Sequence, residues 1–212
     1  MKFDELDDFA RKRAIENQIK FEGSVDSWYI YELEEFAERM QSNGVDVDAR
    51  KITFDVDYSQ SAFICVKFRN QVSDALFKYA GVDLPAELRQ AIKDADVDES
   101  VLDEFDLMLD TGATYVEGVA ERRNADVEIR GDLCDFVFDD NLFSEDETQQ
   151  LDQAFTNVLD KFIHALEGRL VEDASALFDE IRDQCDFWFS EENIVDIIRA
   201  NDYDFDVHGN LI

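Results

Sequence analysis

Apolar residues recur at helical spacing in several segments of the first half of the chain. Asn43-Gly44 marks the end of the second helical segment, and Pro85 fits the first helical position of a later one. This spacing predicts helices at residues 3–20, 26–42, 71–80, 86–95 and 97–110. In the helix predicted at 26–42, the apolar stripe is formed by Trp28, Leu33, Phe36, Ala37 and Met40.

A long helix is predicted in the C-terminal part of the chain. Ser144-Glu145-Asp146-Glu147 matches the capping box that opens many helices. Gly168 costs about 1 kcal/mol relative to alanine inside a helix, so a kink or break there is an alternative to a straight helix. Ser190 is expected to cap a last, separate helix. The apolar stripe of the long helix comprises Leu151, Phe155, Val158, Phe162, Leu166 and Leu170, and it resumes through Leu177, Ile181 and Cys185 to Trp188.

Alternating apolar and polar residues predict two β-hairpins. The first runs from Ile52 to Phe68, with a turn at Ser59-Gln60-Ser61, and the second joins residues 113–119 to 125–130. The pattern therefore predicts an α+β fold, with an antiparallel sheet of about four strands packed with several helices. We expect a single domain over residues 1–212, within which residues 144–200 would form a helical C-terminal subregion.

The charge of the chain is its most unusual property. Asp and Glu total 52 against 20 Lys and Arg, which gives a formal net charge of −32. A field of this sign repels nucleic acid and anionic membranes and attracts basic protein surfaces. Adaptation to high salt is the alternative explanation, and it is favoured by 32 Asp against 20 Glu and by only 8 Lys.

Groups suited to catalysis are scarce in this sequence. Its two His and three Cys show no zinc-ligand spacing, and no phosphate-loop, dinucleotide-binding or nucleophile-elbow motif occurs. His164 falls on the polar side of its helix, and Cys65 falls in a strand pattern where a buried small hydrophobe is the ordinary explanation. We therefore expect a protein that is not an enzyme and has no cofactor or metal site.

The sequence predicts a cytoplasmic protein. Its N-terminus is acidic where a signal peptide would be basic and then apolar, and no run approaches 18 apolar residues. The three Cys are odd in number and widely spaced, which is typical of reduced thiols.

Acidic residues follow helical spacing in one segment without intervening cations. Five carboxylates, separated by 3, 4, 3 and 4 residues, fall on one helical face: Asp96, Glu99, Asp103, Asp106 and Asp110. They would span about 21 Å, with roughly one charge every 5 Å, close to the spacing of about 3.4 Å between phosphates of one DNA strand. A second acidic surface is predicted from Glu172, Asp179, Asp183 and Asp186. A solvated helix face is the plain alternative for either set.

The C-terminal segment resembles a known family. The residues that carry the resemblance are Ser190-Glu191-Glu192, then Ile198-Arg199-Ala200-Asn201-Asp202-Tyr203-Asp204-Phe205, then Gly209. They are similar to the closing segment of phage-encoded proteins known as antirestriction proteins, or as antitoxins of a toxin–antitoxin stability system. Ile52-Thr53-Phe54 and Tyr58-Ser59-Gln60 resemble that family's first strand pair, although Ser61 replaces its Gly-Asp-Gly. The resemblance implies a phage origin and a counter-defence role in the host cytoplasm.

Charge and resemblance lead to one leading hypothesis. The protein would be an acidic DNA mimic that blocks the basic cleft of a host nucleic-acid-binding defence protein, itself contacting neither nucleic acid nor membrane. Three alternatives remain: an antitoxin-like or adaptor protein that binds through an apolar patch, an acidic protein from a saline host, and an enzyme with paired carboxylates. A homodimer would present a longer acidic array than a monomer.

Overall fold

The computed structural model describes residues 1–23, 28–56, 62–94, 114–130 and 145–212. The chain divides into two compact units, each formed by segments that are close in space. The terminal unit comprises Met1–Leu33 together with Asp179–Ile212, and the sheet unit comprises Glu34–Phe178. Two helices cross the boundary, namely α2 (Ile30–Ser42) and α6 (Glu145–Trp188).

The sheet unit contains a four-stranded antiparallel sheet of order β1-β2-β3-β4. Its strands are β1 (Thr53–Asp55), β2 (Phe63–Gln71), β3 (Tyr115–Glu121) and β4 (Ala125–Arg130). The two outer pairs are the hairpins predicted from alternation, and they are joined by the β2–β3 pairing, in which Arg69 lies opposite Glu117. The predicted α+β class with two hairpins is therefore confirmed.

Alternation along the strands separates a buried face of the sheet from an open one. Ile64, Val66 and Phe68 of β2 are buried, whereas the intervening Lys67 is exposed. At Gly118 of β3 a Cβ atom would lie 2.2 Å from the Asp126 carbonyl oxygen, so a side chain does not fit there. Cys65 is half-buried on the open side, so the expectation that it is a buried hydrophobe was only partly right.

Two short helices of the sheet unit, α3 (Asp74–Ala80) and α4 (Leu84–Asp94), contact α6 through their side chains, α4 through the ion pair of Glu87 with Lys161. The Phe77 and Phe162 rings pack edge to face with centroids 5.7 Å apart, and the Tyr79 hydroxyl donates a hydrogen bond to Asp173 Oδ2 at 2.5 Å. Burial, together with the Asp173 carboxylate, raises the pKa of Tyr79 above its usual value. A helix from 97 to 110 was also predicted, but those residues lie outside the described ranges.

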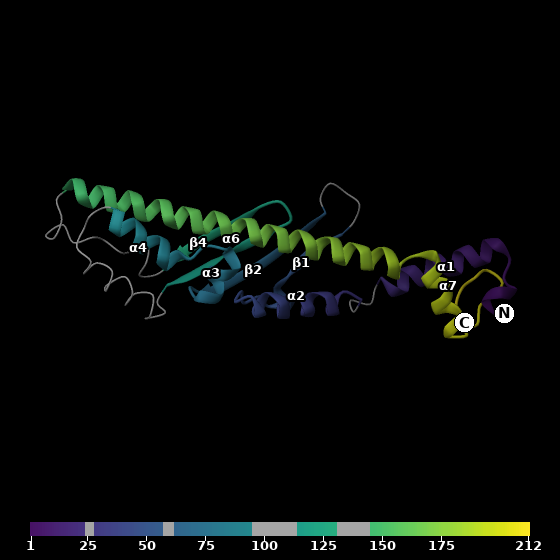
Figure 1. Ribbon diagram of the computed structural model, residues 1–212. Coiled ribbons are helices and arrows are strands. Elements are labelled where there is room, and N and C mark those ends of the chain that lie inside the picture. The colour runs from purple at the N-terminus through teal and green to yellow at the C-terminus, as the bar shows by residue number, and fades with distance from the viewer. Residues whose placement is uncertain (24–27, 57–61, 95–113, 131–144) are drawn as a thin grey trace. The chain divides into compact units, whose positions relative to one another are not determined.

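Helix α6 confirms the long C-terminal helix and is continuous over 44 residues. Figure 1 shows it as one unbroken ribbon, and Gly168 falls within its bounds. The kink considered at Gly168 is absent because the stripe on either side, from Phe162 to Leu170, is fully buried and holds the helix in place. Gly168 itself is exposed, and a Cβ atom added there would meet no described atom.

The spacing predicted a single helix from residue 3, but the N-terminal segment is divided into two elements. A 3-10 turn (Phe3–Glu5) precedes α1 (Asp8–Glu22), and the backbone at Leu6 is extended, with ψ 148°. Asp7 accepts a hydrogen bond from the Ala10 N–H at 2.8 Å and caps α1, so this local capping interaction overrides the longer apolar period. Phe3, Leu6, Ala10 and Ala14, which recur at helical spacing in this segment, are nevertheless buried.

The core of the terminal unit forms between α1, α7 (Glu191–Ala200) and the C-terminal tail. Arg199 of α7 donates to Asp4 Oδ1 at 2.8 Å, and this guanidinium holds the pKa of Asp4 below its usual range. The Phe205 N–H donates to the Met1 carbonyl at 2.9 Å, so the two ends of the described chain are paired. The buried members of this core are Phe3, Leu6, Ala10, Ala14, Ile15, Ile194, Ile198 and Phe205.

The tail closes in a tight turn at Asp206 to Asn210. Asp206 Oδ1 accepts hydrogen bonds from the backbone N–H groups of His208 and Asn210 at 2.8 and 2.9 Å. These bonds and one from the Asn210 side chain lower the pKa of Asp206 to about 2. Gly209 lies in the left-handed region at φ +79° and packs against the Ala10 backbone of α1. Residues that carry the C-terminal resemblance thus have identifiable structural roles.

Candidate functional site

The first predicted acidic stripe cannot be placed on the structure. Its residues, Asp96, Glu99, Asp103, Asp106 and Asp110, all fall within 95–113, which lies outside the described residues. The stripe therefore stays a prediction from the sequence.

The second predicted acidic surface lies on α6. Spacings of 7, 4 and 3 residues keep Glu172, Asp179, Asp183 and Asp186 on one side of a continuous helix. Glu172 pairs with Arg169 at 2.8 Å, and Asp179 pairs with Arg182 at 3.0 Å. Exposed pairs of this kind contribute about 0–1 kcal/mol and leave the carboxylates open to competition from another cation.

The remaining two members of this surface are more open. Asp183 and Asp186 are exposed near the C-terminal end of α6, within the terminal unit. Negative charge at a helix C-terminus is unfavourable by a few tenths of a kcal/mol, since the helix dipole is negative there. The charge of Asp186, which lies in the last turn of α6, is therefore not explained by the helix dipole.

Large apolar side chains are exposed mainly in the terminal unit. Phe9 is 76% exposed, Tyr31 is 70% exposed and Phe187 is 59% exposed. In the part of the chain that the structure describes, only Phe63 of the sheet unit joins them. Exposed aromatic and aliphatic side chains of this kind are available to contact a partner. The full set in the terminal unit is Met1, Phe9, Phe21, Ile30, Tyr31, Phe187, Trp188, Val207, Leu211 and Ile212.

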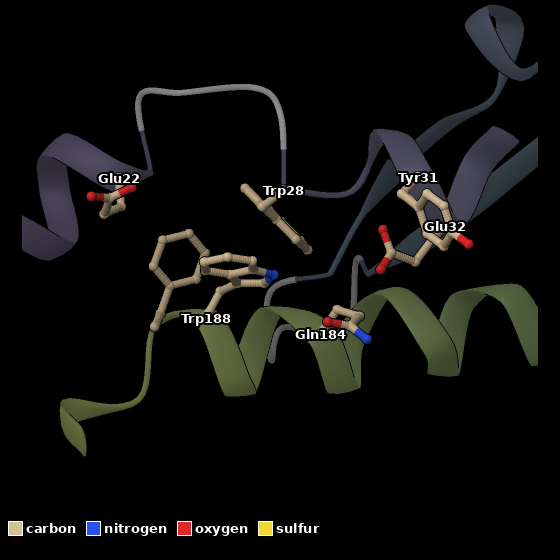
Figure 2. A pocket seen from close by; sticks show the side chains of 7 residues that line it. Glu22, Trp28, Tyr31, Glu32, Gln184 and Trp188 are labelled. Atoms are coloured by element: carbon tan, nitrogen blue, oxygen red, sulfur yellow. The ribbon is translucent and has the colours of Figure 1, made fainter. Parts of the chain in front are cut away.

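The terminal unit also contains an aromatic pocket of about 520 Å³ (Figure 2). Trp28 precedes α2 and Trp188 ends α6, and Figure 2 shows their rings pointing toward one another. Trp28 packs edge to face on Phe189 with centroids 5.7 Å apart, which fixes its orientation. We call this the aromatic pocket, and its lining residues are Glu22, Trp28, Tyr31, Glu32, Gln184, Trp188 and Phe189.

Two carboxylates line the aromatic pocket. Glu22 Oε1 accepts a hydrogen bond from the Gln18 side chain at 2.7 Å. Glu32 Oε2 is buried, yet it accepts no hydrogen bond from the residues that the structure describes. A buried carboxylate oxygen without a donor costs on the order of 1–3 kcal/mol or more. The pocket therefore combines aromatic walls with a carboxylate oxygen, Glu32 Oε2, that has no hydrogen-bond donor among the described residues.

The sequence did not predict this pocket. Trp28 was assigned to the apolar stripe of a helix beginning at residue 26, but α2 begins at Ile30 and Trp28 lies outside it. In the rest of that stripe, Leu33, Phe36 and Met40 are buried as predicted, and Ala37 is half-buried. The one local signal is that both tryptophans of the chain lie near the ends of predicted helices, within short aromatic runs that precede a glutamate by a few residues.

Other chemistry-bearing side chains are dispersed. His164 is exposed, as predicted, with Nδ1 3.5 Å from Glu167. Within the described ranges, no group of three or more His, Cys, Asp or Glu is arranged to hold a metal ion. No helix there combines the length and the apolar character needed to cross a bilayer.

Comparison of the chain with protein-family models, with curated proteins and with solved structures gives no match. The fold and site thus define an α+β protein with a four-stranded antiparallel sheet, a long C-terminal helix and an aromatic pocket in its terminal unit.

Proposed function

We propose that this protein is a non-catalytic inhibitor used in phage counter-defence, which acts as an acidic mimic of DNA. It binds the basic nucleic-acid site of a host defence enzyme and excludes the proper ligand. The observation that carries this proposal is the formal net charge of −32, which results from 52 acidic residues against 20 basic ones. The phage setting rests on the C-terminal resemblance.

Binding is driven by the replacement of phosphates and counterions by carboxylates at the basic side chains of the enzyme. Lysine and arginine side chains of a nucleic-acid cleft meet carboxylates in place of phosphates, and counterions are released from both surfaces. Carboxylates held on a rigid helix lose little entropy on binding, because their backbone is already fixed. The α6 surface, with exposed Asp183 and Asp186, supplies such carboxylates within the described part of the chain.

An antitoxin-like or adaptor function is the second candidate. It is favoured by the exposed aromatic side chains of the terminal unit, including Phe9, Tyr31 and Phe187. In that case a specific partner would cover these side chains, and the charge would serve solubility.

Capture from a bacterial lysate distinguishes the two functions. The immobilised protein is expected to retain a nucleic-acid enzyme at about 50 mM salt and to release it at about 500 mM, since attraction between exposed charges is screened within a few ångströms at high salt. Immobilised duplex DNA of similar total charge serves as the control, and mass spectrometry identifies the bound proteins. If the captured proteins do not bind nucleic acid and are retained equally at both salt concentrations, the result would support the adaptor function and contradict mimicry.

A further inference from the structure

We infer that the aromatic pocket binds an arginine side chain of the protein's basic partner. This inference rests on the proposed function only for the existence of a basic partner. The affinity of the pocket for arginine can be measured without that partner.

The walls of the pocket favour a cation over a neutral apolar group. Trp28, Tyr31 and Trp188 present aromatic rings around one opening, and indole is the strongest of the aromatic faces for cations. Tyr31 and Trp188 are 70% and 37% exposed, so these rings are available to an incoming side chain. A neutral apolar ligand would gain from the rings but would offer no hydrogen-bond donor to Glu32 Oε2.

Glu32 gives the pocket its preference for charge. Its Oε2 atom is buried and has no hydrogen-bond donor among the described residues, and Figure 2 shows the carboxylate between Trp28 and Tyr31. An N–H donor on a cation would satisfy this atom and neutralise the charge together. Glu22 lines the same pocket and adds a second negative charge.

Arginine fits these features better than lysine. Its guanidinium is planar, stacks on aromatic rings, is weakly hydrated and offers five N–H donors, whereas an ammonium is compact and strongly hydrated. The side-chain oxygen of Gln184, on the same wall as Trp188, provides a further neutral acceptor. A volume of about 520 Å³ exceeds one guanidinium, so neighbouring backbone of a peptide can enter as well.

The chain provides its own reporter for this binding. Its only two tryptophans, Trp28 and Trp188, both line the pocket, so intrinsic fluorescence reports on this site. Titration with N-acetyl-arginine amide at constant ionic strength is expected to give a saturable change, with a dissociation constant on the order of 1 mM for a ligand of this size. N-acetyl-citrulline amide, which has the same shape without the charge, is expected to bind at least about tenfold more weakly.

Two variants distinguish binding of arginine in the pocket from attraction by the overall negative charge of the protein. Glu32→Gln keeps the shape of the side chain and is expected to weaken arginine binding about tenfold. Glu38→Gln removes the same charge from an exposed position of α2 outside the pocket and is expected to leave binding unchanged. Far-UV circular dichroism and the urea midpoint show whether each variant is folded.

Each outcome bears on the inference in a defined way. Equal binding of arginine and citrulline, or full arginine affinity in folded Glu32→Gln, overturns it. N-acetyl-lysine amide that binds as tightly as N-acetyl-arginine amide overturns the assignment to arginine. If arginine binds while lysate capture yields no nucleic-acid enzyme, the proposed function fails and the pocket assignment stands. If capture succeeds and arginine does not bind, the pocket assignment fails and the proposed function stands.

Discussion

Replacing Asp103 and Asp106 by lysine is expected to weaken binding to the captured enzyme by about 100-fold or more at low salt, without unfolding the protein. The two residues lie in the segment whose acidic spacing matches that of DNA phosphates most closely, and no Lys or Arg interrupts it between Asp94 and Asp110. Reversal converts two attractive contacts into like-charge contacts, each of which costs up to several kcal/mol in an interface. The dissociation constant of the complex at about 50 mM salt measures the effect.

A matched pair of reversals tests whether position matters as well as total charge. Glu35→Lys with Glu38→Lys has the same three-residue spacing and the same change in net charge, at exposed positions of α2. This control is expected to weaken binding by less than about tenfold, through the long-range field alone. Equal losses of affinity in the two double variants would show that the acidic stripe contributes only through the net charge of the protein. Unchanged binding by the folded Asp103/Asp106 variant would remove the stripe from the binding surface.

Gly209→Ala is expected to destabilise the terminal unit by about 2 to 4 kcal/mol. Two costs add at this position. The backbone has φ +79°, where a Cβ atom is unfavourable, and that atom would lie 2.0 Å from the Ala10 carbonyl oxygen of α1. Since the overlap is with backbone, no side-chain rotation relieves it, and the tail must move away from the core around Phe205.

Gly81→Ala is the control for the backbone term alone. Gly81 ends α3 at φ +73°, but its added Cβ would have no atom within 4 Å. A loss of about 1 to 2 kcal/mol is therefore expected there, smaller than at Gly209. Urea unfolding followed by far-UV circular dichroism measures both variants. Equal losses would show that the contact between Gly209 and Ala10 is not part of the folded terminal unit.

The regular elements could be predicted where one local pattern decides the structure. Ile64, Val66 and Phe68 alternate with polar residues, which is sufficient to predict a half-buried strand. The stripe of α6 is long enough that Gly168 does not end the helix. The break at Leu6 was missed because Asp7 caps α1 locally, although the apolar spacing continues across it.

The arrangement of segments that are distant in sequence could not be predicted in the same way. The pairing of β2 with β3 and the contact between Gly209 and Ala10 depend on tertiary packing and have no local signature. The aromatic pocket is a further case, since Glu32 and Trp188 come from opposite ends of the chain. The acidic surface of α6 could be located from spacing alone, but its pairing with Arg169 and Arg182 required side-chain positions.

The acidic surface and the aromatic pocket have complementary roles in this account. Exposed carboxylates steer a basic partner from a distance, and they accelerate association more than they hold the complex together. A buried aromatic and carboxylate contact acts over a short range and slows dissociation. The Glu32→Gln variant should therefore affect mainly the dissociation rate of the complex, whereas the Asp103/Asp106 reversal should affect both the association rate and the dissociation rate.

Competition between this protein and DNA for one enzyme tests the central claim most directly. The captured enzyme is bound to a fluorescent duplex, and the protein is added at increasing concentration while fluorescence anisotropy is followed. Mimicry predicts complete displacement of the duplex, with an apparent affinity of the protein that falls in proportion to the concentration of duplex. A ternary complex in which enzyme, duplex and protein remain together would contradict it.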